Sequence, residues 1–276
     1  MVVFTLPVVV CGLAITLPHD CFVQEPIWDS WEGLLCWNST GRFTEDLLKA
    51  GLLRLFLALD YLHTECKLVH TDIKADNILG KLEDKGVFES FTKSEIDTPS
   101  PRKFVNGAPV YMSRGFGRPK TFSDSIVLSD FGAAVRGDVK RNHDAQPAVY
   151  RSPEVMLKTP WSYPVDIWNV GAMIWDIFQG RHLFYGNDPD GRGYTTRAHS
   201  VEVVALLGPP PVDMLKRGVR SKESFDGDGK WIADVPIPSD VTVENSIEYL
   251  DDKTKAEFLT FVKGMLQWRP EDRKKS

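Results

Sequence analysis

The sequence predicts an α+β fold in which two long helices form the core and the strands are short. A run that follows Thr44 keeps its apolar residues at helical spacing, and residues 166–175 are apolar on nearly every side. Short apolar runs beside polar loops, such as residues 125–128, are typical of brief strands. Residues 80–124 are polar and contain proline and glycine, which indicates an insertion.

The composition is that of an ordinary globular chain. The 276 residues are 42% hydrophobic and 26% charged, which excludes a disordered, collagen-like or coiled-coil protein. A net charge of −5 argues against direct nucleic-acid binding as the main function, because phosphate binding requires a basic face. The four cysteines all lie in the first quarter without C-x-x-C spacing, so we expect an intracellular protein, in the cytoplasm or the nucleus.

The first eighteen residues carry no charge and are mostly apolar, so a signal peptide or membrane anchor must be considered. No Lys or Arg precedes the apolar run, Pro7 and Gly12 interrupt it, and no small-x-small cleavage site follows it. Two buried strands explain this pattern better than a targeting segment. We therefore expect an atypical apolar N-terminus over residues 1–21 and no membrane association.

The first long helix begins at Thr44, a suitable N-cap residue that precedes two acidic residues. Its apolar positions are Leu48, Leu52, Leu55, Phe56, Leu59 and Leu62. A strand, a loop and a second strand are expected over residues 67–79. After the second long helix, Pro-rich breaks at residues 208–211 and 236–238 divide the remaining chain into short helical segments.

The loop between the first two strands concentrates three polar groups that phosphoryl transfer requires. Asp72 supplies a carboxylate, Lys74 an ammonium group and Asn77 an amide. A carboxylate can orient an attacking hydroxyl and accept its proton, a cation can offset charge on the γ-phosphate, and an amide oxygen can bind Mg²⁺. A solvated surface turn is the alternative, but the apolar neighbours on both sides make it the weaker interpretation.

A second acidic motif follows the third strand. Asp130 supplies another metal-ligating carboxylate, and Gly132 is expected to let the backbone turn sharply. Either motif alone is common by chance, whereas their occurrence together in this order is specific.

With these motifs, the sequence resembles the C-terminal lobe of a eukaryotic protein kinase over residues 22–276. Residues 70–77 are similar to the catalytic loop, and residues 130–132 to the magnesium motif. The resemblance implies ATP and Mg²⁺ as cofactors, with Asp72 and Lys74 as catalytic residues and Asn77 and Asp130 as metal ligands. It implies structural support from His70, Phe131, Gly132, Glu154, Asp166 and Arg273, with a pair expected between Glu154 and Arg273.

Within the kinases, the sequence is similar to the group that contains the cyclin-dependent, MAP and SR-protein kinases. Residues 150–154, Tyr-Arg-Ser-Pro-Glu, close the activation segment as in that group, and His-Thr-Asp-Ile-Lys at residues 70–74 is closest to the SR-protein kinases. The resemblance implies a monomeric serine/threonine kinase that phosphorylates protein substrates, with Arg- and Ser-rich segments as the family-level expectation. Asp-Phe-Gly, where SR-protein kinases often carry Asp-Leu-Gly, is a mild departure.

The nucleotide side of the site is incomplete in the sequence. Residues 21–27 resemble the hinge, so the backbone groups of Glu25 and Ile27 are expected to face adenine. The same resemblance assigns Asp29 to the ribose and Leu79 to the nucleotide site. Neither a G-x-G-x-x-G loop nor a V-A-x-K lysine precedes Thr44, and the chain stops where the last helix is expected. We therefore expect a largely missing small lobe and impaired catalysis.

Three interpretations stay open. The first is a kinase whose small lobe is absent from this chain through truncation or an incorrect gene model. The second is a pseudokinase scaffold that binds protein partners without catalysis, and the third, the least favoured, is a membrane-tethered or secreted protein. The intact Asp72, Lys74, Asn77 and Asp130 favour the first.

Thr71 occupies the position where kinases usually carry an arginine that pairs with a phosphate on the activation loop. Without that cation, such a phosphate has no partner at this place. We therefore expect activity that does not depend on phosphorylation of residues 133–149.

Overall fold

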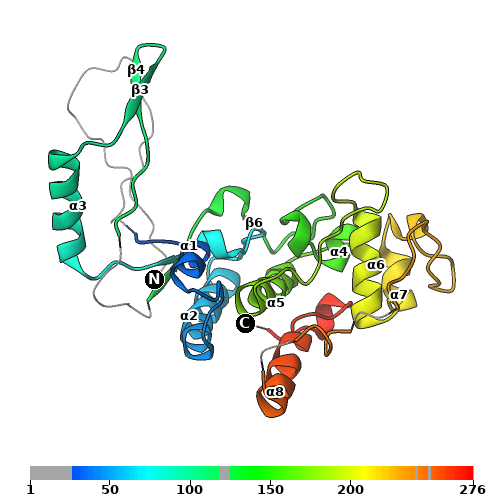
Figure 1. Cartoon of the computed structure of the whole chain (residues 1–276). Helices are drawn as coiled ribbons and strands as arrows, with labels where there is room; N and C mark the ends of the chain where they lie inside the picture. The colour runs from blue at the N-terminus through cyan, green and yellow to red at the C-terminus, as the bar shows by residue number, and fades with distance from the viewer. Residues whose placement is uncertain (1–26, 118–124, 240–241, 248–249, 276) are drawn as a thin grey trace.

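The computed structural model describes residues 27–117, 125–239, 242–247 and 250–275. Both long helices that the sequence predicts are present (Figure 1). α2 (Glu45–Thr64) begins after Thr44, whose hydroxyl accepts a hydrogen bond from the amide of Leu47. α5 (Pro164–Gln179) carries proline in its first turn and ends at Gly180, where φ is 71°. The strands predicted within residues 1–18 lie outside the described residues.

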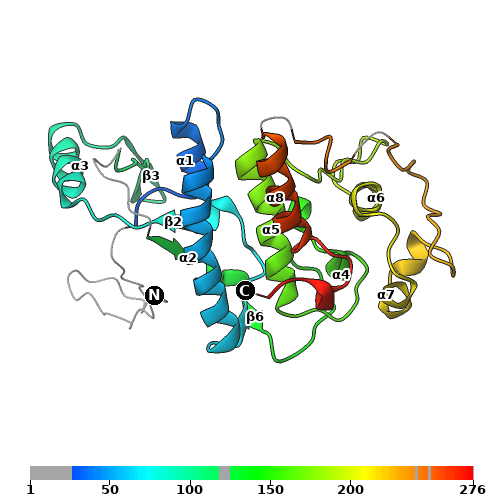
Figure 2. The same cartoon turned by 90° about the horizontal axis from the view of Figure 1, so that it is seen from below.

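α5 lies at the centre of the core. Nearly all of its residues are buried, because apolar side chains occupy almost every position and leave no polar face. α8 (Asp252–Lys263) packs along α5 and brings Phe258 against the rings of Trp175 and Phe178. Figure 2 shows α2, α5 and α8 running side by side. This bundle is the rigid base on which the polar loops rest.

Two short antiparallel strand pairs frame the polar loops. β1 (Leu68–Val69) pairs with β6 (Val135–Arg136), and β2 (Ile78–Gly80) pairs with β5 (Ile126–Leu128). The chain therefore passes from β1 to β2 and later from β5 to β6 at one end of these pairs. Consequently the two acidic motifs, which occupy those two connections, lie next to each other.

Short helices and turns complete the fold. Four further helices surround the bundle: α1 (Trp31–Trp37), α4 (Pro153–Met156), α6 (Thr196–Leu207) and α7 (Val212–Arg217). The 3₁₀ turns are η1 (Ala75–Asn77), η2 (Phe131–Ala133), η3 (Ala148–Tyr150), η4 (Ser221–Glu223) and η5 (Pro270–Asp272). α6 and α7 lie on the side of α5 opposite to α2 in both views. No helix in the described ranges combines the length and apolarity needed to cross a bilayer.

The insertion between β2 and β5 has a structure that the sequence analysis did not predict. It contains α3 (Lys85–Asp97) and a hairpin of β3 (Arg102–Val105) and β4 (Ala108–Tyr111). The ring of Phe116 packs on two rings of α3, and the hairpin turns through Asn106 and Gly107, both with positive φ. Figure 1 shows this insertion projecting away from the helical bundle.

Candidate active site

Asp166, in the first turn of α5, holds the loop between β1 and β2 from beneath. Its fully buried carboxylate accepts hydrogen bonds from the backbone amides of His70 and Thr71, both at 2.8 Å. It also accepts a bond from Nε2 of His63, at 2.9 Å. These donors satisfy a charge that would be costly to bury alone. The sequence analysis missed His63, although its position on the buried face of α2 is a signal for such a role.

His70 joins the two acidic motifs. The ring is fully buried and lies 5.0 Å from the ring of Phe131. Nε2 donates to the carbonyl of Ser129 at 2.9 Å, so Nδ1 is the nitrogen that accepts the amide of Asp72 at 3.3 Å. This places His70 in a bracing position, as the resemblance implies.

The Asp72 carboxylate is fixed by the two neighbours that the sequence singled out. Lys74 Nζ lies 3.2 Å from Oδ2 of Asp72, and the amide nitrogen of Asn77 donates to the same oxygen at 2.9 Å. The Asn77 amide also donates to the backbone carbonyl of Asp72 at 2.9 Å. Since Asp72 remains partly exposed, its carboxylate is oriented and still reachable by a ligand.

Asn77 and Asp130 lie at the same end of the β2–β5 pair. Ile78 pairs with Leu128, and Ser129 donates both its amide and its hydroxyl to the carbonyl of Asn77, so Ser129 lies across from Asn77 and Asp130 is the next residue. The Asn77 amide nitrogen is used by Asp72, which leaves the amide oxygen for a metal. One amide oxygen and one carboxylate suit Mg²⁺, which takes few protein ligands and completes its shell with phosphate and water. In the described ranges, no group of three His, Cys, Asp or Glu side chains is assembled for a metal.

The turn at residues 130–132 differs from the expectation in one respect. The left-handed residue is Asp130, with φ of 60°, whereas Gly132 lies in η2. The Gly132 amide donates to the Asp130 carboxylate at 3.3 Å, and a Cβ at Gly132 would stand 3.2 Å from that oxygen. Glycine is therefore suited to this position because it leaves space beside the Asp130 carboxylate, and the turn itself is made by Asp130.

The nucleotide-side candidates lie along β2, except for Glu25, which is outside the described residues. Trp28 and Asp29 exchange backbone hydrogen bonds with Gly80, and Ser30 bridges to Leu79. Ile27 and Leu79 are half-buried. The Asp29 carboxylate accepts hydrogen bonds from the Ser30 amide at 2.9 Å and from the indole of Trp37 at 3.4 Å, so it faces α1. Its assignment to the ribose stays a prediction.

An open pocket of about 560 Å³ lies between the loop that carries Asp72 and the segment that follows β6. Thr71, Asp72 and Lys74 form one wall. The other residues that line it are Ala133, His143, Asp144, Ala145, Gln146, Pro147 and Arg151. The pocket therefore places the Asp72 carboxylate where a polypeptide segment can approach it.

The segment over residues 133–149 is held by hydrogen bonds that need no phosphate. Thr71 Oγ donates to the carbonyl of Ala133 at 3.0 Å. The Gln146 side chain accepts from the amide and hydroxyl of Ser152 and donates to the carbonyl of Val165 at 2.9 Å. Residues 133–149 contain no Ser, Thr or Tyr. Independence from phosphorylation stays a prediction, and these contacts give it a structural basis.

Gln146, which the sequence analysis missed, should be the residue on which this segment depends. Replacing it with alanine leaves buried partners unsatisfied, so we expect Gln146→Ala to lower the free energy of unfolding by about 1–3 kcal/mol. Urea denaturation measures this. Gln267→Ala is the matched control, because that amide makes one exposed bond to a carbonyl and should cost less. Equal losses in the two variants would contradict the role of Gln146.

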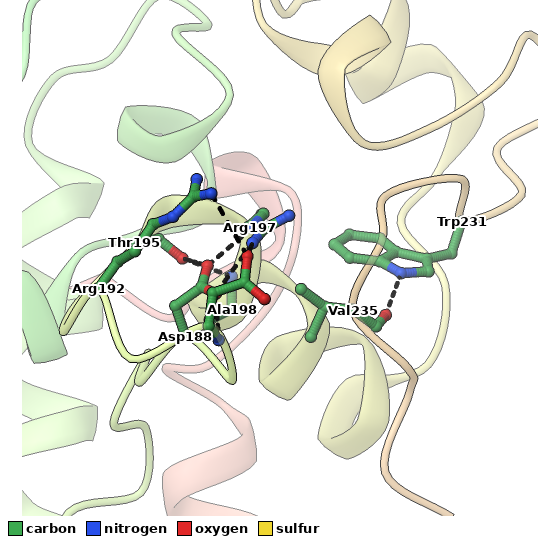
Figure 3. Close-up of polar contacts among 8 residues, drawn as sticks. Asp188, Arg192, Thr195, Arg197, Ala198, Trp231 and Val235 are labelled. Carbon is green, nitrogen blue, oxygen red and sulfur yellow. Dashed lines mark hydrogen bonds and ion pairs between the residues drawn. The ribbon is translucent and has the colours of Figure 1, made fainter.

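Arg151 is supported by the loop between α5 and α6. Its guanidinium lies 5.4 Å from the ring of Tyr194, which precedes Thr195. The buried Asp188 carboxylate accepts from Thr195 Oγ1 at 2.7 Å and from Arg197 Nε at 2.7 Å (Figure 3). The bonds from Arg197 and Thr195 hold the pKa of Asp188 well below its usual range. A tightly closed loop thus positions Tyr194 beneath Arg151.

Glu154 and Arg273 are brought into contact, both with fully buried side chains. Arg273 Nη2 donates to the Glu154 carboxylate at 2.6 Å, while its other nitrogens reach the carbonyls of Pro164 and Gln267 at 3.0 Å each. The guanidinium also lies 5.1 Å from the ring of Trp168. Each of the three guanidinium nitrogens therefore has a hydrogen-bond acceptor. The pair connects the end of the activation segment to α5 and η5.

Three carboxylates lie close enough to affect one another electrostatically, a feature that the sequence analysis missed because they come from separate elements. They are Glu32 of α1, Asp76 of η1 and Asp176 of α5. Burial, followed by repulsion from Asp76 and Asp176, raises the pKa of Glu32. Tyr150 donates to Asp176 at 2.6 Å. Glu32 and Asp76 therefore place negative charge between α1 and the Asp72 loop, whereas the Asp176 carboxylate is paired with Tyr150 and His182.

His182, which contacts the Asp176 carboxylate, should make stability depend on pH. This contact raises the pKa of His182 above its ordinary value of 6.5, so the folded state holds the proton more tightly than the unfolded chain. Its stabilising contribution is fully present below the ordinary value and is lost as the pH rises through the raised one. We expect His182→Gln to lose more unfolding free energy at about pH 6 than at about pH 8. A loss that is the same at both pH values would be inconsistent with this contact.

Comparison with known proteins agrees with this geometry. The protein kinase domain family matches residues 21–275. A serine/threonine protein kinase of Aspergillus fumigatus is 41% identical over 92% of this chain and 62% of the relative. The serine/threonine-protein kinase SRPK of Physarum polycephalum is 27% identical over 92% of this chain and 64% of its own length. The kinase AFC1 of Arabidopsis thaliana is 26% identical over 94% and 53%, respectively. The chain thus spans less than two thirds of each relative.

Proposed function

Because the chain belongs to the protein kinase family, we propose that it transfers the γ-phosphate of ATP to serine or threonine hydroxyls of protein substrates. The observation that carries the proposal is the Asp72 carboxylate, which Lys74 and Asn77 orient at 3.2 and 2.9 Å on the wall of an open pocket. Mg²⁺–ATP would supply the phosphoryl group and offset its charge when bound.

The residues of this chain have separate roles in the proposed reaction. Asp72 accepts a hydrogen bond from the substrate hydroxyl and aligns it for attack, while Lys74 neutralises negative charge beside it. Asn77 and Asp130 would hold the metal at the ends of β2 and β5. Ile27, Leu79 and Asp29 would border the nucleotide.

We further propose that the substrates are basic segments containing serine, of the Arg/Ser-rich kind. The support comes from Glu32 and Asp76, whose carboxylates place negative charge where α1 packs against η1, next to the loop that carries Asp72. Arginine guanidinium groups pair well with carboxylates, whereas an acidic segment would be repelled. The name of the SRPK relative is in keeping with this substrate class but does not by itself assign it.

A peptide panel tests both parts of the proposal. The chain is incubated with millimolar Mg²⁺–ATP and either an Arg-Ser repeat peptide or the matched Glu-Ser peptide, and phosphoserine is measured by mass spectrometry. We expect phosphate on the Arg-Ser peptide, at a rate about tenfold or more above that of the Glu-Ser peptide. Glu32→Gln should reduce the ratio of the rates for the Arg-Ser and Glu-Ser peptides. The same change at the exposed Glu223, Glu223→Gln, should leave this ratio unchanged.

The two failures are distinguishable. Equal transfer to both peptides would overturn the substrate class and leave the kinase activity standing. No transfer to either peptide by folded protein that binds Mg²⁺–ATP would overturn the activity and favour a scaffold that binds partners without catalysis.

A further inference from the structure

The hairpin of the insertion exposes apolar side chains on both of its faces. Phe104 is 65% exposed, Met112 64% and Tyr111 55%, and every residue of β3 and β4 is exposed. In the described part of the chain, the two strands pair only with each other. An isolated two-stranded hairpin is marginally stable in water, so a third strand would stabilise it. The projection of this hairpin away from the bundle leaves room for one (Figure 1).

The outer edge of β3 carries backbone groups that are free to pair. The Met112 amide donates to the carbonyl of Pro101 at 2.8 Å, which makes that pair a hydrogen-bonded one. Hydrogen-bonded and non-hydrogen-bonded pairs alternate along an antiparallel ladder. The next pair, Arg102 with Tyr111, is therefore non-hydrogen-bonded, and so is Phe104 with Pro109. The N–H and C=O groups of Arg102 and Phe104 consequently point away from β4, and no described residue pairs with them.

The other edge of the hairpin is blocked. Pro109 lies in β4 at a non-hydrogen-bonded pair, so its nitrogen faces the outer edge of that strand. Proline has no N–H to donate, and it is typical of strand edges that do not accept a neighbour. An added strand can therefore pair with β3 but not with β4.

The region around the hairpin is basic. The sequence from Thr98 to Ser123 contains five Arg or Lys residues and no Asp or Glu, although the whole chain has a net charge of −5. The Arg102 guanidinium lies 5.8 Å from the rings of both Phe104 and Tyr111, on one face of the hairpin. Lys103 is exposed on the opposite face. An extended strand on the β3 edge would thus meet one cation on each face.

We propose that the outer edge of β3 binds an extended acidic segment of a partner protein as an additional strand. Backbone hydrogen bonds to Arg102 and Phe104 would hold the segment, and its carboxylates would select the basic faces. A peptide fits better than RNA, because only a peptide backbone matches alternating N–H and C=O groups.

Fluorescence anisotropy of labelled peptides on the full chain tests this proposal. The probe is a capped seven-residue peptide of alternating Glu and Val, compared with the same peptide carrying Lys for Glu. A third peptide keeps the acidic side chains but has every amide N-methylated. We expect the acidic peptide to bind, and both other peptides to bind about tenfold more weakly or worse.

Protein variants locate the site. Lys103→Glu should weaken binding of the acidic peptide about tenfold, whereas Lys93→Glu, an equal charge change on α3, should change it less than about twofold. Cross-strand nuclear Overhauser contacts between Phe104 and Pro109 show whether the hairpin persists in Lys103→Glu. Equal binding of the acidic and N-methylated peptides would overturn the proposal. So would tighter binding of oligouridine or phosphatidylserine vesicles that Lys103→Glu abolishes, because the ligand would then be a nucleic acid or a lipid surface.

Discussion

Replacing Arg273 with alanine should be among the most destabilising single changes in this protein. The change leaves the fully buried Glu154 carboxylate without its partner, along with the carbonyls of Pro164 and Gln267. An uncompensated buried charge costs about 3–5 kcal/mol. For a domain of this size, that corresponds to a fall in melting temperature of about 6–20 °C, measurable by differential scanning calorimetry.

Two further variants show whether the loss comes from breaking the Glu154–Arg273 pair or from shortening any arginine side chain. Arg220→Ala removes one partner of an exposed pair with Glu223, whose atoms lie 3.1 Å apart, and should cost at most about 1 kcal/mol. The double variant Glu154→Met/Arg273→Leu removes both buried charges and should be more stable than either single loss. A double variant that is less stable than Arg273→Ala would contradict this explanation.

Replacing Asp72 with asparagine should lower the rate of phosphate transfer about 10²- to 10⁴-fold. The amide keeps the size of the side chain but cannot accept the proton of the substrate hydroxyl. It also loses the charge that attracts Lys74, whose Nζ lies 3.2 Å from the carboxylate. The rate constant for transfer to the Arg-Ser peptide, measured at saturating Mg²⁺–ATP, checks this.

A control must show that the lower rate comes from the loss of the catalytic carboxylate and not from a loss of folded structure. Asp60→Asn makes the same substitution on the exposed face of α2, where the side chain lies away from the pocket, and should leave the rate unchanged. The melting temperature of Asp72→Asn should stay close to that of the unmodified chain, because Asp166, rather than Asp72, anchors the loop. A rate reduced less than tenfold by Asp72→Asn would exclude Asp72 as the base.

Much of the core could be predicted because its signals are local. Thr44 caps α2 as expected. The continuous apolar run predicted a central helix, and α5 is buried on nearly all sides. Asn77 and Asp130 were assigned to one metal only through the family resemblance, and it is the antiparallel pairing of β2 with β5 in the structure that brings them to the same end of these strands.

The features that sequence reasoning missed depend on contacts between distant segments. His63 meets Asp166 across 103 residues, and Gln146 meets Val165 across 19. The helical pattern of α2 can mark His63 as buried, but no pattern identifies Asp166 or Val165 as the partner. The hairpin of β3 and β4 was missed for a different reason. Both strands are fully exposed, and their sequences, Arg-Lys-Phe-Val and Ala-Pro-Val-Tyr, lack the alternation of apolar and polar residues that identifies a half-buried strand.

Paramagnetic broadening by Mn²⁺–ATP would test the central claim most directly, because it locates the metal and nucleotide without requiring turnover. Amide signals are recorded by NMR as Mn²⁺–ATP is added, with Asp130→Asn as the comparison. We predict selective broadening around Asn77 and Asp130, at the ends of β2 and β5, and much weaker broadening in Asp130→Asn. Broadening confined to another part of the molecule, or unchanged by Asp130→Asn, would contradict the assignment of this site.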